Sequence, residues 1–303
     1  MSRQDKKLNP CAIIVSYEPD IRALLSLLEQ VSSQADFILI DNASGNSDEF
    51  LTIAANKPRC VGVHALEQNI GLASAMNLGL REAMQSGYAF AVLFDQDSQV
   101  PASFFANLQT AYIEAQRLSH NQVAAVGPRI VSLRDDSPMP FKLFSSWFNR
   151  VNVRVPGSDR LFKAEFLISS GCLIVLKHLD SIGQMKDEYF IDNIDLEWCF
   201  RAKAKGFEVI GTDHAQLHHS IGVNENNFLV RKGFIVSHSP LRSYYSTRNR
   251  FSLYRQSYAP FAWKLRDFPR FVLKTAWLLL FSKQRIAYAK NILRGLKDSR
   301  GLA

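Results

Sequence analysis

Runs of apolar residues alternate with helical patterns in the first hundred residues of this chain. Continuous apolar runs near residues 11–16, 37–40, 61–65 and 89–94 predict buried strands. Residues 20–34 carry apolar side chains at helical spacing, and residues 73–86 follow a glycine-containing turn, so both segments are expected to be helices. This alternation is typical of a mostly parallel sheet and predicts an α/β fold.

Polar side chains follow three of these strands. They are Ser16 and Tyr17, Asp41 and Asn42, and Asp95 and Asp97. Sheets of this kind bind ligands at the carboxyl ends of their strands. The three clusters are therefore expected to share one rim of the sheet and to form a binding site there.

The pattern changes near residue 227, where basic and aromatic residues become frequent and long strands disappear. We therefore expect a catalytic domain over residues 1–226 and a helical, basic region over residues 227–303. Residues 253–303 hold 11 Lys or Arg and two Asp or Glu, whereas the whole chain has a net charge of only +8. The positive charge is thus confined to the end of the chain.

The position of this charge bears on the expected partners. A nucleic-acid-binding protein would more often carry it on the main domain, so no nucleic acid is expected. Apolar residues at helical spacing lie among the basic ones: Phe268, Phe271, Val272, Thr275, Leu278 and Leu279. Basic and apolar residues together favour an anionic membrane surface, although the apolar stripe could instead pack on the catalytic domain.

Other features of the chain predict a cytoplasmic protein on the membrane surface. The apolar stretch at residues 275–282 is too short to span a bilayer, and residues 1–10 do not resemble a signal peptide. The four cysteines form no C-x-x-C pair and are expected to be reduced, buried thiols.

Asp95 and Asp97 form a D-x-D step directly after a buried strand. Two carboxylates so placed can hold one Mg²⁺ or Mn²⁺, with phosphate oxygens and water completing the shell. Such an ion would help a diphosphate group to leave. A solvated turn is the alternative. His218 follows a strand-like segment at residues 208–211 and is the third candidate ligand, although a single histidine is more often structural.

The segment at residues 192–201 contains the candidate catalytic group. Asp192 precedes an amphipathic helix, where it can act as a general base or cap the helix. Asp195 and Arg201 lie on that helix. Trp198 is equally suited to form a wall for an acceptor or to pack in the core. Earlier in the chain, Asn69 and Gly71 precede a helix whose N-terminus could bind phosphate, or they form an ordinary packed loop.

Five ordered motifs carry a family resemblance: VSYEP (15–19), IDNAS (40–44), QNIG (68–71), FDQDS (94–98) and FIDNIDLEWCFR (190–201). Together they resemble glycosyltransferase family 2, and within it the bacterial rhamnosyltransferases of O-antigen and related polysaccharide assembly. YYSTRN (244–249) is also similar. The resemblance implies a GT-A fold with a C-terminal helical extension, inversion at the anomeric carbon, dTDP-L-rhamnose as donor and a lipid-linked saccharide as acceptor.

The resemblance also implies roles for individual residues. Asp41 would contact the donor base, Asp95 and Asp97 would contact ribose, diphosphate and metal, and Asp192 would be the base. The full donor set is Ser16, Tyr17, Asp41, Asn42, Asn69, Gly71, Asp95, Asp97 and Arg201, and the acceptor set is Trp198 and Asp195.

Two departures from the family pattern matter. Glu18 stands where relatives often carry Asn, and Asp192-Asn193 stands where many carry Glu-Asp, so that Asp192 and Asp195 both remain possible bases. Four other functions stay open. They are transfer from another nucleotide sugar, a nucleotide-binding module without turnover, a membrane-surface adaptor, and nucleotidyl transfer. An adaptor would not need carboxylates at strand ends, and the glycine- and lysine-rich loop usual in nucleotidyltransferases is missing.

Overall fold

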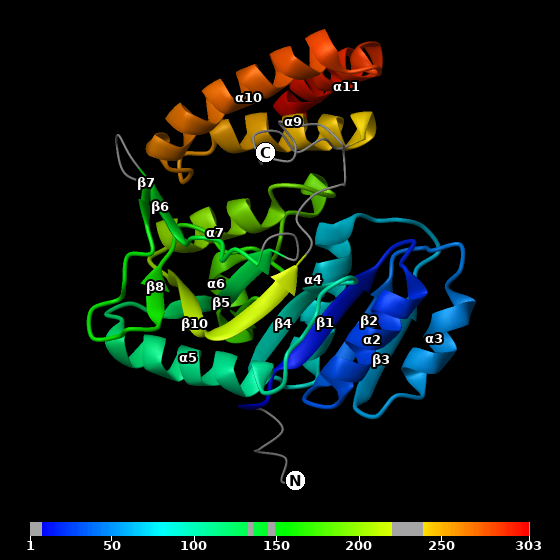
Figure 1. Cartoon of the computed structure of the whole chain (residues 1–303), viewed down its shortest axis with the longest axis vertical. Coiled ribbons are helices and arrows are strands. Elements are labelled where there is room, and N and C mark those ends of the chain that lie inside the picture. Colours follow the sequence, from blue (N-terminus) through cyan, green and yellow to red (C-terminus); the bar gives the residue numbers. More distant parts are fainter. Residues whose placement is uncertain (1–7, 133–135, 145–148, 220–238, 303) are drawn as a thin grey trace.

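The computed structural model describes residues 8–132, 136–144, 149–219 and 239–302 (Figure 1). Ten strands lie in this part of the chain: β1 (Cys11–Ser16), β2 (Asp36–Asp41), β3 (Cys60–Ala65), β4 (Phe90–Asp95), β5 (Val123–Ser132), β6 (Lys142–Phe144), β7 (Asn149–Val151), β8 (Leu161–Lys163), β9 (Leu173–Val175) and β10 (Glu208–His219). The longer helices of the first 219 residues are α2 (Ile21–Ser32), α3 (Asp48–Ala55), α4 (Leu72–Gln85), α5 (Phe104–Leu118) and α7 (Ile194–Ala204), and α6 (Leu179–Ile182) is a single turn.

Eight strands form one mixed sheet in the order β3-β2-β1-β4-β9-β5-β10-β8. Strands β1 to β4 pair in parallel, as the alternating pattern predicts, and each lies within a residue or two of its expected position. Strand β9 is antiparallel to both β4 and β5, and β8 is antiparallel to β10 at the edge. The short β6 and β7 form a separate hairpin.

Helices cover both faces of this sheet. Along β1, Cys11, Ile13 and Val15 pack in a core with α4, α6 and α7, whereas Ala12 and Ile14 pack in a second core with α2, α3 and α5. The period-two alternation of a strand thus divides its side chains between two helical layers. Because both layers are apolar, the polar residues are left at the strand ends, where the site forms.

Three C-terminal helices form a further layer above α7 (Figure 1): α9 (Pro240–Arg255), α10 (Phe261–Phe281) and α11 (Arg285–Asp298). Leu253 and Trp263 pack with Phe200 of α7, and the Phe200 and Trp263 ring centroids are 5.4 Å apart. The expected helical extension is therefore present. The expected boundary at residue 226 lies outside the described residues.

The apolar stripe of α10 is divided between two surroundings. Leu278 is buried against Tyr288 and Ile292 of α11, while Phe268 and Val272 are 49% and 46% exposed. Part of the stripe packs, as one expectation had it, and part of it faces solvent. Within the described residues we find no helix with the length and apolar character that crossing a membrane requires.

Candidate active site

The ends of β1 and β2 are joined through the carboxylate of Asp41, which is only 1% exposed. The Ser16 hydroxyl donates to Asp41 Oδ1 at 2.9 Å, and the backbone N–H of Ser44 donates to Oδ2 at 2.8 Å. Two residues of the expected donor set are thus brought together. Their bonds hold the carboxylate in one orientation at the rim of the sheet.

Two further contacts connect the rim loops. Asn42 Nδ2 donates to Asn69 Oδ1 at 3.0 Å, and Asn42 Oδ1 accepts from the backbone N–H of Ile70 at 2.9 Å. The backbone N–H of Tyr17 donates to Gln96 Oε1 at 2.7 Å, which ties the end of β1 to the D-x-D turn. The Tyr17 side chain itself is 48% exposed and available to a ligand.

Gly71 serves packing rather than phosphate binding. Its φ is 88°, and a Cβ there would lie 2.6 Å from the Phe190 ring and 2.8 Å from Phe190 Cα. The first backbone N–H groups of α4, from Leu72 and Ala73, both donate to the Phe190 carbonyl. Because these two N–H groups already have an acceptor, they do not form the phosphate site that the sequence predicts there. Gly71 instead lets the 190 loop approach α4.

Asp95 and Asp97 differ in their surroundings. Asp95 is partly buried and accepts a hydrogen bond from the Ser170 hydroxyl, while Asp97 is exposed. The backbone N–H of Gln99 donates to the His218 carbonyl at 3.4 Å, which brings the end of β10 beside this turn. In the part of the chain that the structure describes, no three His, Cys, Asp or Glu side chains are grouped to hold a metal ion by themselves.

The loop before α7 has an unusual backbone that a buried asparagine supports. Phe190, Asp192 and Asn193 all have positive φ, between 61° and 69°. The side chain of Asn249, fully buried on α9, donates from Nδ2 to the carbonyls of Tyr189, Ile191 and Asp192 at 2.7, 2.8 and 2.9 Å. Residues in this left-handed region persist only when their surroundings fix them. Asn249 is a positioning residue that the sequence signalled only through the YYSTRN resemblance.

The carboxylate of Asp192 is paired with an arginine from the C-terminal layer. Arg242 Nη2 donates to Asp192 Oδ1 at 2.8 Å, and Arg242 Nε lies 3.1 and 3.2 Å from the two oxygens. Asn193, not Asp192, is the N-cap of α7, so the capping alternative for Asp192 does not apply. The Asp192 oxygens are thus already occupied by hydrogen bonds from a guanidinium, in the geometry typical of an arginine–carboxylate pair.

Asp195, one turn further on, is in the opposite situation. The pKa of its partly buried carboxyl is raised to about 6, mainly by burial and also by the negative charges of Asp95 and Asp192, although backbone hydrogen bonds from Leu196 and Ser169 lower it. A carboxyl with this pKa can accept a proton near neutral pH. Strongly shifted acids beside other carboxylates are a frequent mark of active sites.

Trp198 and Arg201 belong to the interior of the domain. Trp198 is 1% exposed and its Nε1 donates to the Gly183 carbonyl at 2.9 Å, so it packs and does not form an acceptor wall. Arg201 donates to both carboxylate oxygens of Glu197 at 2.8 and 2.9 Å and to the carbonyls of Ile182 and Gln184. The expected donor contact of Arg201 is corrected, because its guanidinium already has internal acceptors.

The chain belongs to glycosyl transferase family 2, whose family model matches residues 13–167. It is therefore a glycosyltransferase. It is 28% identical over 298 residues to the dTDP-rhamnosyl transferase RfbF of Shigella flexneri, a match that covers 97% of this chain and 96% of the relative. It is also 21% identical over 307 residues to the low-salt glycan biosynthesis hexosyltransferase Agl10 of Haloferax volcanii, covering 95% of this chain and 91% of that protein.

Solved structures confirm the GT-A fold. GalNAc-T7 with UDP, GalNAc and Mn²⁺ superposes with a TM-score of 0.55 at 13% identity, over 92% of this chain and 57% of that one. TarS 1–349 of S. aureus in complex with UDP-GlcNAc gives a TM-score of 0.52 at 13% identity, over 97% of this chain and 92% of that one. The match to TarS includes the C-terminal helices, because it extends over nearly all of both chains.

The buried pair of Arg201 with Glu197 predicts that Arg201 contributes to the free energy of unfolding. Arg201→Met removes the charge while filling similar space, and it leaves the fully buried Glu197 carboxylate without its cation. Breaking a buried pair in this way costs about 3–5 kcal/mol. We expect chemical denaturation to show a loss of that size. Arg154→Met, which removes an exposed pair with Asp159, is the control and should cost less than about 1 kcal/mol. Unchanged stability together with lost nucleotide affinity would restore Arg201 to the donor site.

Proposed function

We propose that this enzyme transfers L-rhamnose from dTDP-L-rhamnose, with inversion, to a lipid-linked saccharide acceptor in bacterial cell-surface polysaccharide (O-antigen) biosynthesis. The observation that carries the donor is the likeness to a dTDP-rhamnosyl transferase, which extends over 97% of this chain and 96% of the relative. A match of this length includes the rim loops, the 190 loop and the C-terminal helices. The lipid-linked acceptor is supported by the family resemblance and by the surface of α10 and α11.

The site suggests a direct displacement. Asp195 accepts the proton of an acceptor hydroxyl, the hydroxyl oxygen bonds to the anomeric carbon, and the bond from that carbon to the nucleoside diphosphate breaks. One displacement inverts the configuration and needs no covalent intermediate. We place the base at Asp195 instead of Asp192, because Arg242 holds the Asp192 carboxylate while burial makes that of Asp195 basic. Asp192 then positions the loop.

Asp95 and Asp97 fit the binding of Mg²⁺ or Mn²⁺. They supply oxygen ligands at one strand end, and an ion of this kind is commonly bound by one or two carboxylates together with substrate phosphates. When bound, the ion would neutralise charge on the leaving diphosphate. His218 lies on the strand beside this turn and is retained as a candidate third ligand. Asp41, Ser16, Tyr17, Asn42 and Asn69 would bind the nucleoside from the opposite side.

A second candidate is a nucleotide-binding module without turnover. Asp195 argues against it. Burying a carboxyl beside two other acids lowers the stability of the fold, and a protein that only binds nucleotide gains nothing in return. Transfer from another nucleotide sugar is the other alternative, and the donor assay below separates it.

The donor assignment predicts a selective reaction. Purified protein is incubated with Mg²⁺, a lipid-linked saccharide extract and each of dTDP-L-rhamnose, UDP-glucose and UDP-galactose, and the products are weighed by mass spectrometry. We expect the acceptor mass to rise by one deoxyhexose with dTDP-L-rhamnose and to change little with the others. Equal or faster turnover of a UDP-hexose rejects the rhamnose assignment, and nucleotide binding without any product favours the binding module.

The base assignment predicts a pH profile. Because Asp195 must be deprotonated, kcat/KM should fall as the pH drops through about 6. Asp195→Asn should lower the rate by about 10²- to 10⁴-fold while dTDP binding persists. Its folded pKa is raised, so the ionised carboxyl opposes folding above pH 6, and Asp195→Asn should not lower the thermal midpoint at pH 8. A steady-state pH profile and thermal denaturation measure these effects.

Asp192→Asn is the matched comparison for Asp195→Asn. It removes one carboxylate three residues away and breaks the pair with Arg242. If Asp192→Asn abolishes turnover while Asp195→Asn stays active and still loses kcat/KM at low pH, the base is Asp192.

We further propose that the enzyme docks on an anionic membrane surface, on the inner face of the bacterial plasma membrane. Exposed apolar side chains gather on α10 and α11, with Phe261, Leu273, Leu280, Phe281, Ile286 and Leu293 each at least 66% exposed. Exposed basic residues lie among them, including Lys283, Arg285 and Lys290. Apart from Arg270 the exposed positions of α10 are apolar, and the exposed basic residues are concentrated on and just before α11. Contiguous apolar surface of this kind marks an interaction site.

Docking is tested by vesicle flotation. Full-length protein should float with vesicles containing anionic lipid and be released by high salt, because each basic residue contributes about 1 kcal/mol near such a surface. Leu280→Ser combined with Phe281→Ser should weaken binding. Ile113→Ser is the control, because Ile113 is 67% exposed on α5, remote from this layer (Figure 1). Equal flotation of the double variant and wild type would contradict docking through α10.

A further inference from the structure

A groove lies beside Asp195, between α10 and the catalytic domain. It is formed by β6, the start of α7 and the first half of α10, together with Phe166. Its lining combines cations with aromatic rings: Lys142, Arg266, Arg270, Phe144, Phe166 and Trp263. The donor motifs at the ends of β1 and β2 contribute nothing to it. A molecule in this groove would therefore contact Asp195 without occupying the rim proposed for the nucleoside.

The groove carries an excess of positive charge. Its two acids are Asp195 and Asp267, against three cations. Asp267 is already paired outside the lining, because Arg250 Nε donates to it at 2.7 Å and the Tyr254 hydroxyl at 2.6 Å. Three basic side chains thus line the groove together with two acids, one of which already has partners outside it.

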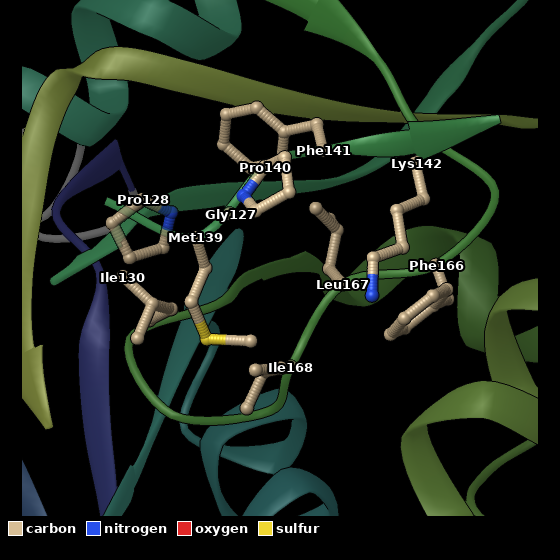
Figure 2. Close-up of a pocket in the computed structure, with 10 residues that line it drawn as sticks. All are labelled: Gly127, Pro128, Ile130, Met139, Pro140, Phe141, Lys142, Phe166, Leu167 and Ile168. Atoms are coloured by element: carbon tan, nitrogen blue, oxygen red, sulfur yellow. The ribbon is translucent and has the colours of Figure 1, made fainter. Parts of the chain in front are cut away.

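Lys142 shows how closely these cations are placed. Figure 2 shows its side chain running toward Phe166 and Leu167, and the same residue also lines the apolar pocket drawn there. Burial lowers the pKa of Lys142, and the charge of Arg270 lowers it further. Two cations that repel each other in a partly apolar groove would be stabilised by a ligand of opposite charge.

We propose that this groove binds a phosphate or diphosphate group of the acceptor, so that the enzyme selects a phosphate-bearing acceptor; this rests on the proposed glycosyl transfer. Several cations, two of them arginines, suit a group with two or more negative charges, and guanidinium groups pair with phosphate through two parallel hydrogen bonds. The aromatic rings would lie along the adjoining saccharide or prenyl carbons. Because Asp195 lines the same groove, binding there would bring an acceptor hydroxyl to the base.

The proposal is tested by binding, without turnover. Full-length protein is saturated with dTDP and Mg²⁺ to fill the donor site, and geranyl diphosphate, inorganic pyrophosphate or geraniol is titrated in by calorimetry. We expect both phosphate compounds to bind and geraniol not to bind. Tighter binding of geranyl diphosphate than of pyrophosphate would identify a prenyl headgroup as the source, and equal binding would identify the phosphate group alone. Binding of geraniol as tight as that of geranyl diphosphate overturns the proposal.

Charge-removing variants locate the site. Arg270→Gln replaces an exposed residue and should fold normally. Arg270→Gln and Lys142→Gln, each made alone, should weaken geranyl diphosphate binding by about tenfold or more, because each removes a charged hydrogen bond. Arg22→Gln, which removes the same charge from an exposed position on α2, should have no effect. Unchanged binding by both groove variants overturns the proposal. If Arg270→Gln loses geranyl diphosphate binding but the wild-type enzyme does not use dTDP-L-rhamnose, the groove proposal stands and only the donor assignment is rejected.

Discussion

One buried side-chain amide ties the C-terminal helices to the loop before α7. Asn249, from the C-terminal layer, donates to three carbonyls of the loop that leads into α7. That loop holds three residues in the left-handed region, a conformation that costs free energy unless its surroundings compensate for it. It also carries the carbonyl that caps α4 and precedes the candidate base. The geometry around Asp195 therefore depends on a residue more than fifty positions later in the chain.

The electrostatics of the site follow from this arrangement. Asp95, Asp192 and Asp195 are brought near one another in a partly buried space, and their charges cannot all be accommodated equally. Arg242 from α9 neutralises Asp192, and Ser170 donates to Asp95. Asp195 is left with burial and with the field of its neighbours. The C-terminal helices thus supply both the cation that pairs with Asp192 and the amide that supports the loop before Asp195.

Much of the first half of the fold follows from sequence. The four parallel strands, α2 and α4 lie within about two residues of their expected bounds, because buried strands and amphipathic helices leave strong local patterns. The antiparallel β9 and the short β6 to β8 have three residues each and depend on pairing between distant segments, which no local pattern records. The same difference separates the site residues. Ser16 and Asp41 lie together as strand-end residues should. Trp198 and Arg201 instead bond to carbonyls in α6 and just after it, and the role of Asn249 depends on a tertiary contact, so no local pattern records either.

The close packing of α11 on α9 has a consequence for how the enzyme is made. A Cβ on Gly295 would lie 2.7 Å from the Tyr244 carbonyl, so the final helix lies directly against the helix that carries Asn249. During synthesis the sheet and both aspartates of the D-x-D turn emerge first, while the loop before α7 still lacks its supporting amide. The nascent chain can thus form its nucleotide-binding rim before it has an ordered base. Because Asn249 lies on α9, the loop that leads to Asp195 can be supported only after α9 has been made, so the rim would form before the candidate base is held in place.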